Sequence, residues 1–180
     1  MPGGLELRIP PVAVVLLGAA LMGLGAWGMP VLGFHLPGRV FVAGGLALGG
    51  MMVALAGVAT FRRAKTTVNP MKPETSTSLV TSGIYSLTRN PMYLGFLLVL
   101  LGWAAYLSNA LSFALVPGYI LYMNRFQIRP EERALASRFG PEFAAYKTRV
   151  RPWTQISRRS TGTRSSMFAR RPGFNPLALP

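Results

Sequence analysis

Residues 91–123 read PMYLGFLLVLLGWAAYLSNALSFALVPGYILYM and contain no charged side chain. One continuous α-helix of this length would be about 50 Å long, whereas the hydrocarbon core of a bilayer is about 30 Å thick. The stretch therefore predicts two antiparallel membrane spans, over about residues 91–107 and 110–126, that turn at Ser108 and Asn109. Pro117 is a candidate kink in the second span.

Two further apolar runs precede this hairpin, over about residues 12–28 and 40–61. A cleaved signal peptide is the rival interpretation of the first run, but its length and the second run behind it favour a retained span. The second run is rich in Gly and Ala, which allow close helix packing in lipid. The partner helix could belong to the same chain or to a second copy in a dimer. The sequence thus predicts an all-α integral membrane protein with about four transmembrane helices.

The charges are segregated along the chain. Of the 19 Lys and Arg residues, only Arg39 follows the first span and precedes the second, which leaves 18 on the other side. The positive-inside rule then predicts a multi-pass protein with both termini in the cytoplasm. Topology also explains the net charge of +14, so no nucleic-acid partner is expected.

The segment after the spans has a different pattern. Pro130 and two following acids are typical of a helix start, and Gly140-Pro141 predicts a break between two short helices within residues 130–150. The amphipathic spacing favours interfacial helices on the cytoplasmic side of the membrane. We expect residues 1–157 to form one membrane domain and residues 158–180 to form a basic, disordered tail. The apolar stripe of the predicted interfacial helices consists of Leu135, Phe139, Phe143, Tyr146 and Val150.

The composition excludes several kinds of chemistry. The chain has no Cys, one His, and five acids that are all Glu. Disulfides, thiolate catalysis and Cys/His zinc sites are therefore ruled out, and no metal is expected. Catalysis with an organic cofactor, or without one, is what remains.

The start of the third span is a candidate binding site. Asn90 followed by Pro91 is typical of an N-cap and a first helical residue, and a helix N-terminus attracts anions. Arg89 would suit a carboxylate, and the ring of Tyr93 could face a cation. S-adenosylmethionine carries both groups, although spacing alone does not single it out. The simpler alternative is a capped membrane helix with Tyr85 and Tyr93 in the aromatic belt.

A second candidate cluster lies beyond the fourth span. Arg125, Arg129, Glu131 and Glu132 fall at the membrane level at which Asn90 is expected. The simpler interpretation is a helix start with local ion pairs. In the functional interpretation, a Glu binds an ammonium group or ribose hydroxyls, and an Arg orients an anionic substrate.

Four motifs follow one another in this part of the chain. They are Leu-Val-Thr-Ser-Gly-Ile-Tyr (79–85), Arg-Asn-Pro-Met-Tyr-Leu-Gly (89–95), Glu-Glu-Arg-Ala-Leu (131–135) and Phe-Gly-Pro-Glu-Phe-Ala-Ala-Tyr (139–146). In this order they resemble the isoprenylcysteine carboxyl methyltransferase family, in a broader group that includes phospholipid N-methyltransferases. The resemblance covers about residues 77–152 and neither the first two spans nor the tail.

This resemblance implies an enzyme that uses S-adenosylmethionine without a Rossmann domain. The cofactor would lie between the loop before the hairpin and the helix after it. Glu131 would be the acid of the cofactor site, with Glu132 beside it. The substrate-side Arg of the family would fall near Gln127, which Arg125 and Arg129 flank. The other implied cofactor residues are Thr77, Ser78, Leu79, Val80, Tyr85, Asn90, Pro91, Met92 and Tyr93, to which the local chemistry adds Arg89.

Two positions depart from the family pattern. The typical Arg-His-Pro is Arg-Asn-Pro here, and because Asn90 cannot titrate near neutral pH, a general-base role is disfavoured at this position. The His that often opens the earlier loop is Thr77.

The expected function is methyl transfer from S-adenosylmethionine to an amphiphilic, lipid-like acceptor at the cytoplasmic membrane interface. Carboxylate, amine and thiol acceptors all stay open, as does the oligomeric state. The alternative is a non-catalytic membrane scaffold or assembly factor with the same fold. A transporter is disfavoured because the spans have almost no ionisable residues.

Overall fold

The computed structural model describes residues 7, 9–63 and 78–153. Within these ranges every regular element is helical, and the one β-type pairing is an isolated bridge between Gly33 and Asn109. This confirms the predicted all-α class. The tail expected over residues 158–180 lies outside the described residues.

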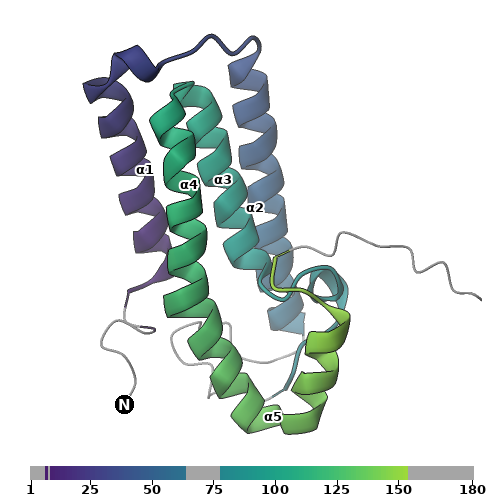
Figure 1. Ribbon diagram of the computed structural model, residues 1–180. Helices are drawn as coiled ribbons and strands as arrows, with labels where there is room; N and C mark the ends of the chain where they lie inside the picture. The colour runs from purple at the N-terminus through teal and green to yellow at the C-terminus, as the bar shows by residue number, and fades with distance from the viewer. Residues whose placement is uncertain (1–6, 8, 64–77, 154–180) are drawn as a thin grey trace, which may run out of the picture.

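Four helices lie side by side, in the spatial order α1, α4, α3, α2 (Figure 1). They are α1 (Pro11–Gly28), α2 (Arg39–Arg63), α3 (Pro91–Leu107) and α4 (Ala110–Met123). By length and composition α1 and α2 could each cross a membrane, and α3 is a shorter apolar helix. The apolar helices fit a membrane protein, and spanning by α3 and α4 stays a prediction.

The chain reverses direction between α3 and α4 at the two residues where the sequence predicts the turn. Ser108 has a left-handed backbone with φ of 50° and ends α3. The Asn109 side chain accepts a hydrogen bond of 3.0 Å from the Leu111 N–H and so caps α4. Pro117 lies inside α4, which continues through it as one helix.

The most extensive helix contact joins α2 to α3, and glycine makes it possible. A Cβ atom on Gly50 would lie 2.5 Å from the Gly95 carbonyl oxygen, and a Cβ on Gly95 would lie equally close to the Gly50 oxygen. Small residues of this kind let two backbones approach closely in lipid. Part of the glycine content of the second span therefore serves packing within the chain, one of the two uses that the sequence allows.

Helix α1 is attached differently, through side chains that donate to its carbonyl oxygens. Trp103 Nε1 donates to Ala19 at 3.0 Å, and Ser112 Oγ donates to Met22 at 3.3 Å. Asn109 Nδ2 donates to Met29 at 3.0 Å, just beyond the end of α1. These bonds hold α1 against α3 and α4 without close backbone contact.

Helix α4 continues into the next element through a π-helical turn, Asn124–Ile128, and then α5 (Arg129–Arg149). The sequence predicts a span that ends near residue 126 and a new helix from residue 130, whereas the structure is helical throughout this region; where the span ends along it stays a prediction. Pro130 lacks an N–H and crowds the preceding turn of an α-helix, and a wider turn before it relieves both problems. The predicted break is confirmed, because Gly140 has φ of 46° and interrupts α5.

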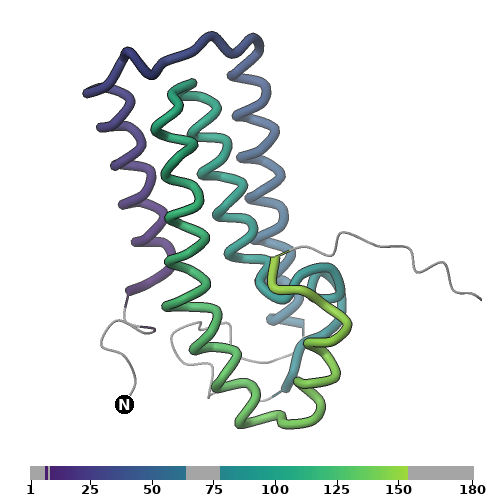
Figure 2. Tube along the Cα trace, in the orientation of Figure 1, coloured from purple at the N-terminus to yellow at the C-terminus, as the bar shows by residue number. Residues whose placement is uncertain are grey.

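Beyond Gly140, α5 turns back beneath the bundle, and Figure 2 follows this path. The sequence predicts that the apolar stripe of α5 faces lipid, but in the structure other parts of the protein cover it. Phe143, Tyr146 and Val150 are buried, and Leu79, Leu135 and Phe139 pack around them. An amphipathic pattern indicates that a face is covered but not what covers it, and here residues 78–90 cover it.

Candidate functional site

A pocket lies at the α5 end of the bundle, where α2 ends and α3 begins. It contains about 510 Å³ of empty space, counting the solvent at its mouth. Its wall comes from the end of α2, from the segment before α3 with its short 3₁₀ helix Gly83–Ser86, and from α5. The lining residues are Phe61, Ser78, Leu79, Val80, Tyr85, Arg89, Asn90, Glu131, Glu132, Leu135, Phe143 and Tyr146.

Most of the predicted cofactor residues thus lie around one cavity. Pro91, Met92 and Tyr93 do not line it. Pro91 is buried beside Gly57, and Met92 packs against the bundle core. Thr77 lies outside the described residues. The predicted residues that line the pocket are Ser78, Leu79, Val80, Tyr85, Arg89, Asn90, Glu131 and Glu132.

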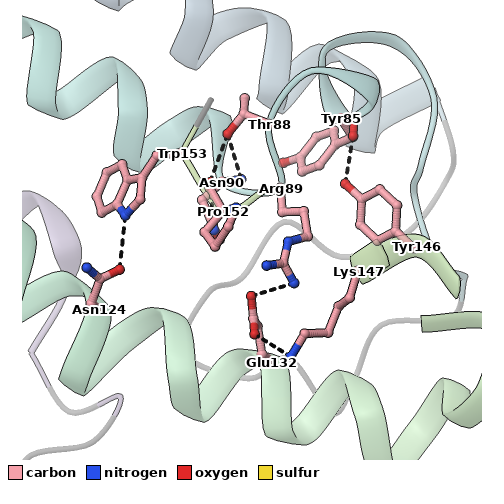
Figure 3. A network of polar contacts seen from close by, with 10 residues as sticks. All are labelled: Tyr85, Thr88, Arg89, Asn90, Asn124, Glu132, Tyr146, Lys147, Pro152 and Trp153. Atoms are coloured by element: carbon pink, nitrogen blue, oxygen red, sulfur yellow. Dashed lines mark hydrogen bonds and ion pairs between the residues drawn. The ribbon is translucent and has the colours of Figure 1, made fainter. Parts of the chain in front are cut away.

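The carbonyl oxygen of Pro152 ties the start of α3 to the end of α5. It accepts hydrogen bonds from Thr88 Oγ1 at 2.9 Å and from Asn90 Nδ2 at 3.1 Å (Figure 3). Asn90 does occupy the N-cap position, but its side chain makes no cap. That part of the prediction is wrong because the amide is used in a long-range contact.

Two neighbouring bonds complete this connection. The Arg89 N–H donates to the Arg151 carbonyl at 3.0 Å. Trp153 Nε1 donates to Asn124 Oδ1 at 3.0 Å, as Figure 3 shows. The pocket wall is therefore fixed by bonds between segments that are far apart in the sequence.

The charged side of the pocket is centred on Glu132. Arg89 Nη1 lies 2.7 Å from Glu132 Oε1, and Lys147 Nζ lies 3.0 Å from Glu132 Oε2 (Figure 3). The Arg89 side chain is only 9% exposed, and its buried Nε has no hydrogen-bond partner among the described residues. One buried donor of the guanidinium is thus available to an anionic ligand group.

Glu131 points to a different partner. It accepts a hydrogen bond of 3.1 Å from the Tyr93 hydroxyl. Burial, with a smaller contribution from Glu132, raises the pKa of Glu131 to about 7, although the Tyr93 hydrogen bond opposes the shift. The sequence predicts that Tyr93 offers its ring face, whereas the structure uses its hydroxyl. A carboxyl group whose pKa lies near neutrality would lose its proton and become negatively charged when a cation binds beside it.

Aromatic residues form the rest of the wall. The Tyr85 ring meets Phe61 edge-on at 5.0 Å between centroids, and the Tyr146 hydroxyl donates to the Tyr85 carbonyl at 2.7 Å. Burial raises the pKa of both tyrosines, so they stay neutral at physiological pH. The lining residues that the sequence does not predict are Phe61, Leu135, Phe143 and Tyr146. The last three belong to the apolar stripe of α5, whose spacing predicts a membrane-facing surface instead of a pocket wall.

The predicted substrate-orienting arginines do not reach this pocket. Arg125 and Arg129 are both exposed and neither lines it. The Arg125 guanidinium lies over the Phe126 ring, 5.5 Å from its centroid. Gln127, at the position where the resembling family has its Arg, is buried and donates to the Ile9 carbonyl at 2.7 Å.

Comparisons with known proteins point to one family. A family model described as phospholipid methyltransferase matches residues 38–142, which is more than half of the chain. Protein-S-isoprenylcysteine O-methyltransferase of Saccharomyces cerevisiae is 37% identical over 82 residues, which is 44% of this chain. Cobalt-zinc-cadmium resistance protein CzcN of Cupriavidus metallidurans is 44% identical over 73 residues, which is 41% of this chain.

The extent of these matches differs between relatives. The matched segment covers 33% of both the yeast protein and CzcN. An uncharacterized protein of Haemophilus influenzae is 48% identical over 62 residues, which is 34% of this chain and 98% of that protein. No solved structure matches the chain significantly.

Proposed function

We propose, because the chain belongs to the phospholipid methyltransferase family, that it transfers a methyl group from S-adenosylmethionine to a lipid-like acceptor. Membership of this family makes the chain a membrane methyltransferase in broad class. The methyl donor, the acceptor and the membrane side of the reaction are the parts that we add.

The observation that carries the proposal is the pairing of opposite charges in one pocket. The unpartnered Nε of Arg89 suits a carboxylate, and the poised carboxyl group of Glu131 suits an ammonium. The amino-acid end of S-adenosylmethionine carries both groups. When bound, this cofactor supplies an electrophilic methyl group on a sulfonium centre. The aromatic wall formed by Phe61 and Tyr85 offers ring surfaces to the ligand.

The role of the protein in such a reaction is to orient the reactants and control charge. Glu132 holds Arg89 and Lys147 together, so it positions the guanidinium at the pocket. Tyr93 fixes the Glu131 carboxyl group from the α3 side. A carboxylate acceptor could react without losing a proton, whereas an amine would have to arrive deprotonated.

A lipid-like acceptor is supported by the description of the matching family and by the name of one relative. One name refers to phospholipids and the other to S-isoprenylcysteine, and both describe groups that carry long hydrocarbon chains. The apolar, outward-facing surfaces of α1 and α2 fit an enzyme that meets such molecules in the membrane. The acceptor chemistry within this class stays open.

The direct test is calorimetric binding of S-adenosylmethionine to the full chain in mild detergent. Glu131→Gln removes the charge but keeps the shape, so affinity should fall about ten- to a hundredfold. Glu142→Gln is the matched control, because Glu142 is exposed and does not line the pocket. Parent protein that is folded yet does not bind the cofactor would favour the scaffold alternative.

Methyl transfer itself is tested with labelled S-adenosylmethionine and a total lipid extract. Label in an extractable lipid would support the proposal and identify the acceptor. Folded protein that binds the cofactor but labels no lipid would argue for an acceptor of another class.

The location of the pocket follows from the charge asymmetry of the chain. We propose four spans with both termini and the pocket on the cytoplasmic side, because only Arg39 of the 19 basic residues lies between the apolar runs over about residues 12–28 and 40–61. Reporter fusions after residues 65 and 155 should indicate cytoplasm, and a fusion near residue 35 the opposite side. An external signal from the fusion after residue 155 would overturn this topology.

A further inference from the structure

A second cavity lies within the bundle, away from the charged pocket. It contains about 610 Å³ of empty space, counting the open space at its mouth, and lies between α1, α3 and α4. We call it the α1–α4 groove. It begins beside Val14 and Tyr122, near the α5 end of the bundle, and extends to Leu21 and Leu115, deeper along both helices. The residues that line it are Val14, Leu17, Gly18, Leu21, Met22, Leu100, Leu115, Gly118, Tyr119 and Tyr122.

The shape of the groove depends on a missing side chain. A Cβ atom on Gly118 would meet no other atom within 4 Å, although Gly118 lines the groove. A larger residue at this position would therefore project into open space without disturbing the packing of α4. The wall is otherwise hydrocarbon, apart from the two tyrosine hydroxyls at one end.

One of these hydroxyls has no partner. The Tyr122 oxygen is buried, and it makes no hydrogen bond with any described residue. A buried hydroxyl without a partner is unfavourable, so a polar group that reached it would stabilise the site. The groove thus combines an apolar length with one unsatisfied polar group at its α5 end.

The other hydroxyl links the groove to the charged pocket. Tyr119 donates to the Tyr93 carbonyl at 3.2 Å, and the Tyr93 hydroxyl donates to Glu131. Tyr119 lines the groove, and Glu131 lines the pocket. Tyr93 therefore stands between the two cavities and contacts the wall of each.

We propose that the α1–α4 groove binds one hydrocarbon chain of the methyl acceptor, with the polar head of the acceptor hydrogen-bonded to Tyr122 and directed toward Tyr93 and Glu131. This inference rests on the proposed function, and it adds where the acceptor binds and what its chemical class is. The occupant is an amphiphile with a flexible apolar chain. A wholly polar acceptor would leave the groove unused.

The test uses a long-chain fatty acid with a diazirine near the end of its chain, and the full protein in phosphatidylcholine nanodiscs. Photolysis should label α1 and α4 around Leu17, Leu21 and Leu115, and excess unlabelled fatty acid should compete. Gly118→Leu fills the groove, so competable labelling should fall severalfold. Tyr122→Phe keeps the ring but removes the hydroxyl, and it should lower labelling about two- to tenfold.

Gly45→Leu is the matched control for the filled groove. Gly45 is also an outward-facing helical glycine with no atom within 4 Å of an added Cβ, but it lies on α2 and does not line the groove. It should leave labelling unchanged. Labelling that spreads evenly over α1 to α4, or that Gly118→Leu does not reduce, would overturn the inference.

A second measurement separates this inference from the proposed function. Gly118→Leu should abolish methyl transfer to the lipid extract and leave the calorimetric affinity for S-adenosylmethionine unchanged. Normal transfer by Gly118→Leu would overturn the groove assignment while leaving the methyltransferase proposal intact. Absence of cofactor binding in the parent would instead defeat the proposed function, and the crosslinking would still decide whether the groove holds a chain.

Discussion

The two sides of α3 make opposite kinds of contact. Toward α2, the backbones meet through Gly50 and Gly95 so closely that a single added carbon would collide with a carbonyl oxygen. Toward α1, the contact is made by long side chains such as Trp103, which donates to Ala19. We call the contact between α2 and α3 the tight seam, and the contact of α1 with α3 and α4 the looser seam. The tight seam is closely packed along its length, whereas the looser seam leaves the α1–α4 groove open beside it.

This difference shows how one small bundle can combine rigidity with space for a ligand. Backbone contact between glycines depends on shape alone, and it fixes α2 and α3 as one unit. The pocket is built at the end of that unit, from Phe61 of α2 and Asn90 before α3. Side-chain contacts hold α1 at a greater distance, which leaves a cavity where an apolar chain could lie.

The largest effect is expected where the tight seam is broken. Gly95→Leu would force a side chain against the Gly50 carbonyl and Ala54, so it should lower the free energy of unfolding by about 3 kcal/mol or more. Gly45→Leu, on the open face of α2, should be neutral or slightly stabilising. Thermal unfolding in detergent measures both. Equal midpoints for the two variants would mean that the seam is not tightly packed.

A smaller effect is expected at Glu131 of α5, which lines the pocket at the end of the tight seam. Its pKa in the folded protein is about 7, above the ordinary value of 4.5, so the folded state binds the proton more tightly than the unfolded state does. The stabilisation of the folded state by protonated Glu131 is fully present below about pH 4.5 and is lost as the pH rises through 7. The cofactor-free protein should therefore be about 1–3 kcal/mol less stable at pH 8 than at pH 5.

This dependence can be assigned by substitution. Glu131→Gln should remove most of the change in thermal midpoint between pH 5 and pH 8, whereas Glu142→Gln should retain it. If the Glu131→Gln profile matched that of the parent, the proton would belong to another group.

The smallest effect is expected in the looser seam. Ser112→Ala removes the hydroxyl that donates to the Met22 carbonyl at 3.3 Å. Hydrogen bonds between membrane helices average about 0.6 kcal/mol, so the loss of stability should be of that order. Unfolding by denaturant in mixed micelles can measure it. A loss of stability as large as that of Gly95→Leu would show that the two seams are equally sensitive to substitution.

Local chemistry predicted the parts of this molecule that depend on neighbouring residues. The turn at Ser108 and Asn109, the position of Asn90 before α3 and the break at Gly140 all follow from preferences within a few residues. The all-α class and the two long apolar helices follow from composition. Of the eight predicted residues around the pocket, seven were implied by the family resemblance and Arg89 by the local chemistry of the helix start.

Long-range contacts were not predictable in this way. The Asn90 side chain bonds to Pro152, and Tyr93 turns its hydroxyl to Glu131, because folding places distant segments beside them. The stripe on α5 shows the same limit. Its spacing predicted a covered face correctly, but nothing in the sequence showed that residues 78–90 rather than lipid would cover it. Arg125 and Arg129 do not line the pocket, because proximity in sequence to Glu131 says little about the direction of a side chain, and their role toward a substrate stays a prediction.

The bonds at Pro152 also set an order of events during synthesis. Its carbonyl oxygen joins Thr88, which lies 64 residues earlier in the chain, so the connection cannot form until every helix described here has left the ribosome. The seam between α2 and α3 needs only residues that emerge much sooner. The helix bundle can therefore assemble first and the pocket last, and a nascent chain would lack the complete pocket until the end of α5 packs beneath the bundle.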